Sequence, residues 1–207
     1  MARIERTSER YRAHHRASRP EDFVFAVERI KLFQEAVGGP GRRVLDLGCR
    51  YGALTQHYVE GNQVVGLDID RDALERAAEL GIETCWADVE DAFPFDDASF
   101  DVVVAGELLE HVRDPLHVIE ECGRVLRPGG TLVGSVPNAF RAKNRLRFLL
   151  GRKPEKDPTH LHMFSAGDVR SLLAGFGESK LDFIAGRLVF LSRRLMANDI
   201  VFSARKS

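Results

Sequence analysis

Residues 44–52 read VLDLGCRYG, a short apolar run with one acid that leads into a turn carrying two glycines. A buried strand that runs into a glycine-bearing turn is typical of open α/β sheets, which bind ligands at the carboxyl ends of their strands. Asp68 lies 20 positions after Gly48, at the end of a second apolar run. An acid at this place is positioned to accept hydrogen bonds from ribose hydroxyls. The turn and the acid together predict a site for a ligand that contains a nucleoside.

The residues of the turn argue against two other nucleotide sites. A dinucleotide fingerprint requires small residues at the positions that Gly48, Arg50 and Ala53 occupy. Arg50 stands where a missing side chain would let a pyrophosphate approach the backbone, which disfavours NAD. No Gly-Lys-Ser/Thr sequence follows, which argues against a phosphate-binding P-loop.

Apolar runs and amphipathic stretches alternate around this turn and predict a doubly wound α/β sheet. Strands are expected at 43–47, 63–68, 83–87, 100–105 and 131–136, with helices at 52–60, 71–80 and 115–126 between them. Two further strands are expected within 180–204, and a helix capped by Ser165 is expected before them. We divide the chain into an N-terminal arm and cap helix, residues 1–40, and a main domain, residues 41–207. The cap helix is expected to begin near Pro20, and a basic helical insertion is expected at 139–157.

Composition restricts the class of protein. The 207 residues are 44% hydrophobic and 29% charged with a formal net charge of −1, as in an ordinary soluble globular domain. The near-zero charge argues against a DNA partner. Three cysteines without metal-type spacing fit a reducing cytoplasm, and no signal peptide or membrane-spanning run is apparent.

Six short motifs and one isolated acid occur in a recognisable order. They are DLGCRYG (46–52) with Asp68, ADV (87–89), FPFD (93–96), SFDVV (99–103), LEHV (109–112) and RVLRPGG (124–130). In this order they resemble the class I S-adenosylmethionine-dependent methyltransferases, from about residue 43 to residue 136. The resemblance implies a Rossmann-like, mostly parallel seven-stranded sheet with one antiparallel strand and helical cap insertions.

The same resemblance implies the residues that bind S-adenosylmethionine. Asp46, Gly48, Cys49 and Gly52 would surround the methionine moiety, and Asp68 would hold the ribose. Ile69 would pack on the adenine, Asp88 and Val89 would face its amino group, and Gly106 would line the sulfonium region. Arg29 could reach the cofactor carboxylate, although an arginine on an amphipathic helix is more often simply solvated. Arg50 replaces the usual glycine, a substitution that is tolerated if its backbone angles are ordinary.

Glu107, Glu110 and His111 follow the fourth expected strand and supply candidate catalytic groups. On a helix, their i, i+3 and i+4 spacing would place all three on one face, where they could bind a divalent metal. His160 could add a fourth ligand or a base. This arrangement resembles the ubiquinone-biosynthesis O-methyltransferases and, more distantly, the small-RNA 2′-O-methyltransferases, in which a Glu-x-x-Glu-His sequence is associated with a metal-assisted hydroxyl acceptor. Two alternatives stay open for His111: a general base without metal, or a structural histidine that orients the loop.

The basic segment has three interpretations. Residues 139–152 could form a lid helix packed beside the acceptor pocket, which we favour slightly. They could also form an interfacial helix through which a peripheral enzyme reaches lipid-linked acceptors, or an anion clamp for a phosphate-bearing or RNA substrate. The scarcity of aromatic residues among the basic ones argues against RNA.

From these features we predict a cytoplasmic methyltransferase that acts on a hydroxyl of a small molecule. A non-catalytic module that binds the cofactor without turnover is the alternative, together with an enzyme whose acceptor is lipid-linked or RNA.

Overall fold

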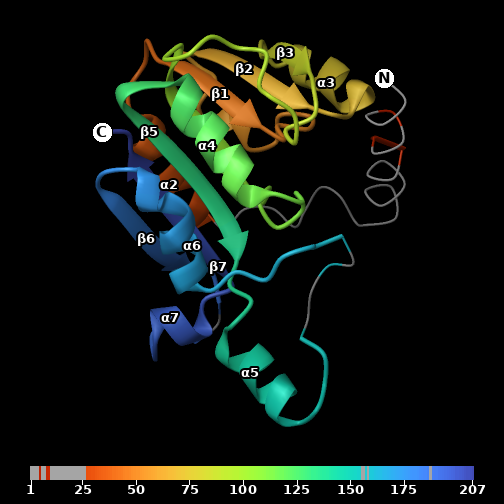
Figure 1. Cartoon of the computed structure of the whole chain (residues 1–207), viewed down its shortest axis with the longest axis vertical. Coiled ribbons are helices and arrows are strands. Elements are labelled where there is room, and N and C mark those ends of the chain that lie inside the picture. The colour runs from red at the N-terminus through yellow and green to blue at the C-terminus, as the bar shows by residue number, and fades with distance from the viewer. Residues whose placement is uncertain (1–4, 6–7, 10–26, 155–156, 158, 187) are drawn as a thin grey trace.

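The computed structural model describes residues 5, 8–9, 27–154, 157, 159–186 and 188–207, and its centre is one seven-stranded sheet (Figure 1). The strand order is β3-β2-β1-β4-β5-β7-β6. The strands are β1 (Arg43–Leu47), β2 (Gln63–Asp68), β3 (Glu83–Trp86), β4 (Phe100–Gly106), β5 (Leu126–Pro137), β6 (Ser179–Ile184) and β7 (Asp199–Arg205). The five strands β3, β2, β1, β4 and β5 pair in parallel with their neighbours. Strand β7 runs antiparallel to both β5 and β6. The predicted doubly wound, mostly parallel sheet with one antiparallel strand is therefore confirmed.

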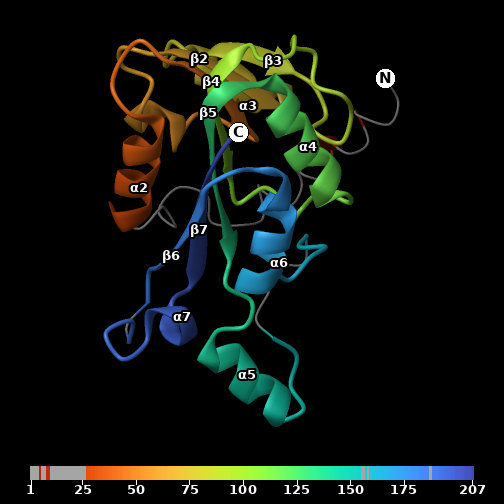
Figure 2. The same ribbon diagram turned by 60° about the vertical axis from the view of Figure 1, so that its left-hand side comes forward.

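Helices cover both faces of this sheet, which explains why its central strands are apolar on both sides. On one face, Leu45 and Val103 pack with Val118 of α4 (Pro115–Val125) and Val169 of α6 (Ala166–Leu172). On the other face, the sheet packs against α2 (Val27–Val37) and α3 (Arg71–Ala78). Figure 2 shows α2 on one side of the sheet and α4 and α6 on the other.

The local signals for helix boundaries work where polar caps are present. Asp70 accepts a hydrogen bond at the start of α3, and Asp114 accepts two at the start of α4. Ser165 and Asp168 form a capping box at the start of α6, as the sequence predicts for Ser165. The expected start of the cap helix near Pro20 lies outside the described residues.

The prediction of a helix at 52–60 is wrong. Only a 3₁₀ turn, η1 (Thr55–His57), forms there. Gly52 has a φ of +82°, which a right-handed helix does not allow, and the Thr55 and Tyr58 hydroxyls turn inward to a buried carboxyl of β1. The amphipathic pattern of this segment therefore comes from a turn whose side chains point inward around Asp46, and not from a helix.

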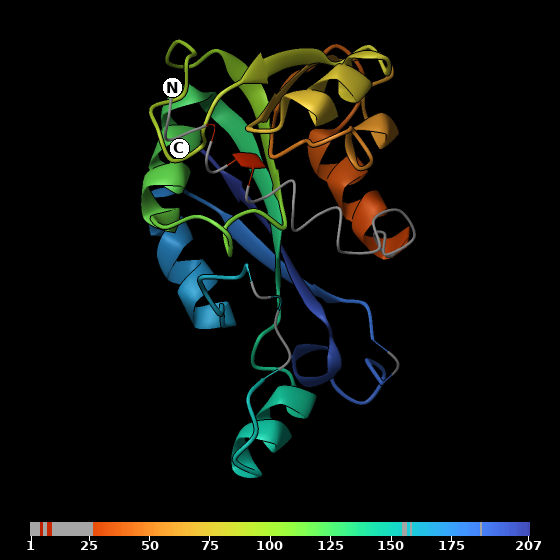
Figure 3. The same cartoon turned by 90° about the vertical axis from the view of Figure 1, so that its right-hand side faces the viewer.

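The C-terminal third extends beyond the carboxyl end of the parallel strands. Strand β5 continues to Pro137 and leads into α5 (Ala142–Leu149), which stands away from the sheet near α7 (Arg193–Met196) (Figures 1 and 3). None of the described helices reaches the length and apolarity that crossing a bilayer requires.

Candidate active site

Asp46 is buried at the end of β1 and holds the turn that follows it. Its Oδ2 accepts hydrogen bonds from Thr55 Oγ1 at 2.5 Å and from Tyr58 Oη at 2.7 Å. The pKa of Asp46 is raised to about 6, because the effect of burial exceeds the opposing effect of these two hydrogen bonds. The two hydroxyl contacts therefore give the turn a defined shape around this carboxyl group.

The backbone of the turn is left-handed at three positions: φ is +68° at Gly48, +51° at Arg50 and +82° at Gly52. A Cβ on Gly52 would lie 2.7 Å from Leu80 Cδ1, so this glycine is also required by its packing. The sequence analysis expected arginine to be tolerated at position 50 if its backbone angles were ordinary, and they are not. Arg50 occupies a left-handed conformation that favours glycine. In this conformation its backbone N–H donates a hydrogen bond to the Asp68 carboxylate.

This backbone conformation predicts that glycine stabilises the folded protein more than alanine does at position 50, the opposite of the usual order. A left-handed residue with a Cβ costs roughly 1–2 kcal/mol, whereas glycine costs roughly 0.5–1 kcal/mol in chain entropy. We therefore expect R50G to be more stable than R50A by about 1 kcal/mol. Urea unfolding of both variants measures this difference, and a more stable R50A would show that the turn is not strained.

Asp68 ends β2 beside this turn, and backbone groups hold its carboxylate in place. Oδ2 accepts from Arg50 N at 2.9 Å and Oδ1 accepts from Asp70 N at 2.8 Å. Burial raises the pKa of Asp68, and these backbone hydrogen bonds oppose the rise. The parallel register pairs Leu47 with Leu67, so the end of β2 and the turn after β1 lie side by side. The two elements of the predicted nucleoside site are thus brought together.

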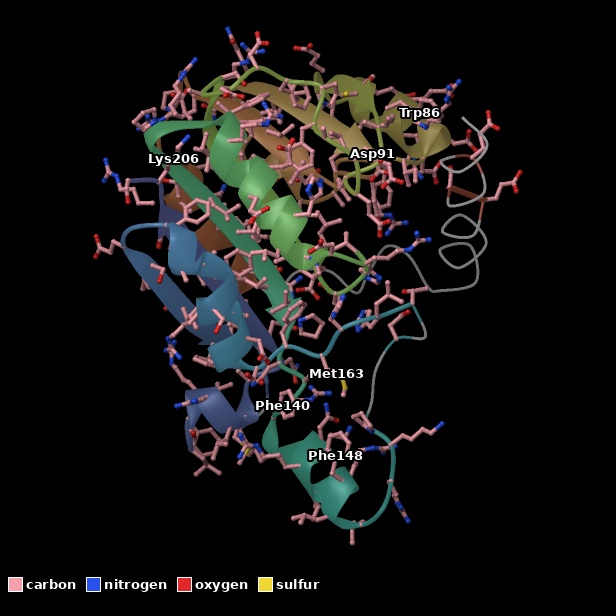
Figure 4. The ribbon with its side chains drawn as sticks, in the orientation of Figure 1. Trp86, Asp91, Phe140, Phe148, Met163 and Lys206 are labelled. Atoms are coloured by element: carbon pink, nitrogen blue, oxygen red, sulfur yellow. The ribbon has the colours of Figure 1, made fainter. Side chains whose placement is uncertain are left out.

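The end of β3 carries a residue that the sequence analysis did not single out. Trp86 ends β3, opposite Asp68 in the register, and its indole N–H donates to the carbonyl of Ile69 at 3.0 Å. The Arg71 guanidinium lies 3.8 Å from the centre of the Trp86 ring, and Figure 4 shows this tryptophan beside α3. The sequence signal that could have identified Trp86 is its position at the end of the expected strand next to the one that ends at Asp68.

The other predicted cofactor residues lie around the same strand ends. Asp88 is buried and accepts from Glu90 N at 3.0 Å, while Val89 packs against the core. Cys49 is buried, and its Sγ donates to the Arg50 carbonyl; burial raises the pKa of this thiol, so it stays neutral. Gly106 ends β4, where a Cβ would lie 3.1 Å from Leu54 Cδ2.

The segment after β4 is not a helix, so the predicted alignment of Glu107, Glu110 and His111 on one helical face is wrong. Residues 107–113 form bends and turns, and Glu107 has a φ of +52°. This geometry separates the side chains. Glu107 turns to Arg29, with Oε1 3.4 Å from the guanidinium, and it does not join the candidate metal-binding group.

Arg29 is buried between acids from two distant segments. Its guanidinium lies 2.7 Å from Asp199 of β7 in addition to its contact with Glu107. Burial and Glu107 raise the pKa of Asp199 to about 6, and Arg29 opposes this. The structure thus places Arg29 in an ion-pair network whose other member, Asp199, sequence reasoning did not single out. Whether Arg29 also contacts a cofactor carboxylate stays a prediction.

Glu110, His111 and His160 come together from segments about 50 residues apart. One potential ligand atom from each lies within 4.8 Å of the others. The His111 and His160 rings meet edge to face with their centres 4.7 Å apart. His160 therefore takes the place that the sequence analysis assigned to Glu107 in the metal-binding group.

Glu110 is the most unusual member of this group. It is 1% exposed, and among the described residues neither of its carboxyl oxygens has a hydrogen-bond partner. Burial, with a further contribution from Glu107, raises the pKa of Glu110 well above its ordinary value. Such a carboxyl must be protonated or compensated by a positive charge. One carboxyl and two imidazoles are a donor set that fits a divalent ion such as Zn²⁺ or Mn²⁺.

The glycine turn, the acid on the neighbouring strand and the strand order together define the class I methyltransferase fold. Residues 45–134 match the family described as methyltransferase domain. The strand order, the glycine turn and this matched segment are thus similar to those of methyltransferase domains.

Curated relatives agree over this region. The chain is 34% identical over 131 residues to a ubiquinone biosynthesis O-methyltransferase of Alkalilimnicola ehrlichii, covering 59% of this chain and 53% of the relative. It is 39% identical over 114 residues to the enzyme of that name from Vibrio cholerae, covering 52% and 46%. The chain thus spans about half the length of the curated relatives it matches.

Solved structures share the fold over most of the chain. A SAM-dependent methyltransferase from Archaeoglobus fulgidus superposes with a TM-score of 0.68 at 22% identity, covering 86% of this chain and 92% of that one. A possible histamine N-methyltransferase from Thermotoga maritima gives 0.69 at 19% identity, covering 99% and 97%. At these identities the similarity concerns the fold.

Proposed function

We propose that this protein is a cytoplasmic S-adenosylmethionine-dependent methyltransferase that methylates a hydroxyl group of a small molecule. The observation that carries this proposal is the left-handed turn at 48–52, held beside Asp68 in a methyltransferase domain. The names of the curated relatives support a hydroxyl acceptor. The free thiols of Cys49, Cys85 and Cys122 fit a reducing compartment. We keep the division into an arm, 1–40, and a main domain, 41–207, as part of the proposal.

The proposed roles of the site residues follow from the chemistry. When bound, S-adenosylmethionine supplies an electrophilic methyl group on its sulfonium. Asp68 would hold the ribose, and the 48–52 turn would hold the methionine part, so that the chain aligns donor and acceptor and excludes water. His111 would take the proton from the acceptor hydroxyl, with Glu110 and His160 beside it. Glu107 would stabilise the loop through Arg29.

Binding of a divalent ion is the alternative to a metal-free base for the same three side chains. Glu110, His111 and His160 would hold it, and it would lower the pKa of the acceptor hydroxyl. Addition of Mg²⁺, Mn²⁺ or Zn²⁺ to chelator-treated protein distinguishes the two cases. Restored turnover by one ion supports the metal site, and unchanged turnover leaves His111 as the base.

Two measurements test the main proposal in sequence. Calorimetry with S-adenosylmethionine and S-adenosylhomocysteine is expected to show binding of both. The protein is then incubated with separate pools of phenols, catechols and amines. S-adenosylhomocysteine is expected to form with the phenol and catechol pools and not with the amines. Binding without turnover would favour the non-catalytic module, and absence of binding would refute the proposal.

The surface around α5 favours acceptors that reside at a membrane. The preferred interpretation of 139–152 as a lid with a buried apolar stripe is wrong, because Leu146, Leu149 and Leu150 are all exposed, Leu149 by 84%. A second exposed apolar run, residues 188–191, includes Phe190 at 76% exposure. It precedes α7, which contacts α5, so both runs lie at one end of the molecule (Figure 1). Figure 4 places Phe148 and Met163 at this end too.

Basic side chains lie among these apolar ones. Lys143 and Arg145 of α5 and Arg193 and Arg194 of α7 are exposed. Exposed leucines beside arginines match the interface of an anionic bilayer, to which each basic residue adds about 1 kcal/mol. We therefore propose that this amphiphilic end, α5 with 188–196, docks on anionic lipid while the site faces a lipid-soluble acceptor.

Liposome flotation tests the amphiphilic end. The wild type is expected to float with phosphatidylglycerol vesicles and to remain in solution with phosphatidylcholine vesicles or at high salt. L149E combined with F190E is expected to abolish flotation, because a charge then replaces apolar contact. L116E is the matched control, since Leu116 is an exposed apolar residue on α4 and should leave flotation unchanged. Equal recovery of wild type and double variant would contradict membrane docking.

A further inference from the structure

A chain of three polar groups ends on His111. Asp157 Oδ1 lies 2.6 Å from Thr159 Oγ1, and the same Oγ1 lies 3.1 Å from His111 Nδ1. Thr159 N also donates to Asp157 Oδ1, at 2.8 Å. The threonine hydroxyl thus links a carboxylate to one nitrogen of the central histidine.

The segment that carries these groups is attached to the loop that carries His111. Leu161 N and His162 N both donate to the carbonyl oxygen of Glu110, at 2.7 and 3.2 Å. Backbone hydrogen bonds therefore set the position of Thr159 relative to His111. A substitution of the Thr159 hydroxyl should change this contact without releasing the segment.

The direction of the hydrogen bonds follows from the number of protons. An ionised carboxylate only accepts, so the single hydroxyl proton of Thr159 points to Asp157. The oxygen of Thr159 then has only lone pairs to offer His111, and Nδ1 must carry a proton to make the contact. In the neutral ring this leaves the lone pair on Nε2.

We propose that Asp157 and Thr159 are positioning residues that fix His111 in the Nδ1-protonated tautomer. The inference rests on the proposed function in one respect only, that the Nε2 lone pair is the one that accepts the acceptor's proton or binds a cation. Partners of this kind fix the tautomer and the ring orientation of functional histidines, and their loss costs roughly 10- to 100-fold in activity or metal affinity.

Nitrogen NMR of ¹⁵N-histidine-labelled protein tests the tautomer without any turnover. Spectra are recorded at pH 9, where a histidine ring is neutral, and H111Q identifies the His111 signals by their loss. The wild type and T159S are expected to show a protonated Nδ1 and an unprotonated Nε2. T159V, which keeps the shape and loses the hydroxyl, is expected to shift the ring toward the Nε2-protonated form. A wild-type ring protonated on Nε2, or a T159V spectrum like that of the wild type, would overturn the inference.

Kinetics separates this inference from the proposed function. T159V is expected to lower kcat about 10- to 100-fold with little change in KM for S-adenosylmethionine, and T159S is expected to restore most of it. Full activity of T159V would refute the positioning role while leaving the methyltransferase proposal intact. A protein without turnover on any acceptor would refute that proposal, and the NMR result on the tautomer would still stand.

Discussion

Replacing Asp68 with alanine is expected to weaken binding of S-adenosylmethionine by about 100-fold or more. The carboxylate would accept two hydrogen bonds from the ribose, and each hydrogen bond to a charged group contributes about 1.5–3 kcal/mol. The side chain is buried and already oriented by the N–H groups of Arg50 and Asp70, so it needs no reorganisation to bind. Isothermal titration with the methylated and the spent cofactor measures the loss.

Asp70 provides the matched control for this experiment. It is an acid two residues further along, and its side chain caps α3 by accepting from Asp72 N at 3.1 Å. D70A is expected to reduce the free energy of unfolding by about 1 kcal/mol through loss of the cap, and to leave cofactor affinity within about twofold. Equal loss of affinity in D70A and D68A would mean that general loosening of the turn, rather than a ribose contact, explains the effect.

Replacing His111 with alanine is expected to lower kcat by about 100-fold or more. Removal of a positioned general base costs roughly 10²–10⁴-fold, and removal of a metal ligand would abolish the same step. Affinity for S-adenosylmethionine should change little, because all the proposed cofactor residues except Gly106 and Arg29 lie at or next to the ends of β1, β2 and β3, away from the loop that carries His111. Single-turnover kinetics with a saturating acceptor measures the rate constant of methyl transfer.

An exposed histidine controls for the loss of an imidazole as such. His57 lies on the surface at the end of η1, and H57A should retain wild-type turnover. H160A is expected to reduce turnover, since its ring contacts that of His111. Full turnover of H111A at every pH would assign this histidine a purely structural role.

Parallel strands were the most predictable part of this fold. The boundaries of β1 and β2 match the predicted 43–47 and 63–68 to the residue. Strands buried on both faces read as continuous apolar runs, and a glycine or a polar residue marks their ends. Helix 52–60 failed because its amphipathic pattern came from side chains that bury themselves around Asp46 without helical backbone.

The catalytic cluster was only partly predictable, because spacing along the chain presupposes a backbone conformation. Glu107, Glu110 and His111 share a face only on a helix, and the left-handed backbone at Glu107 removes that premise. Two of the three residues stay together in the cluster, and His160 joins them through a segment that hydrogen-bonds to the Glu110 carbonyl. The same holds for Arg29 and Asp199, which lie far apart in sequence and form an ion pair at 2.7 Å.

The sequence by itself determined the positions of the parallel strands and the class of sheet, and it brought Asp68 and the 48–52 turn forward as the predicted nucleoside site. These depend on local apolar runs, on glycines and on an acid at a strand end, each of which acts within a few residues. Only the tertiary structure decided which charged side chains face one another and that the basic helix α5 exposes its leucines. Such pairings depend on how separate loops pack at one edge of the sheet, and that packing has no local signature in the chain.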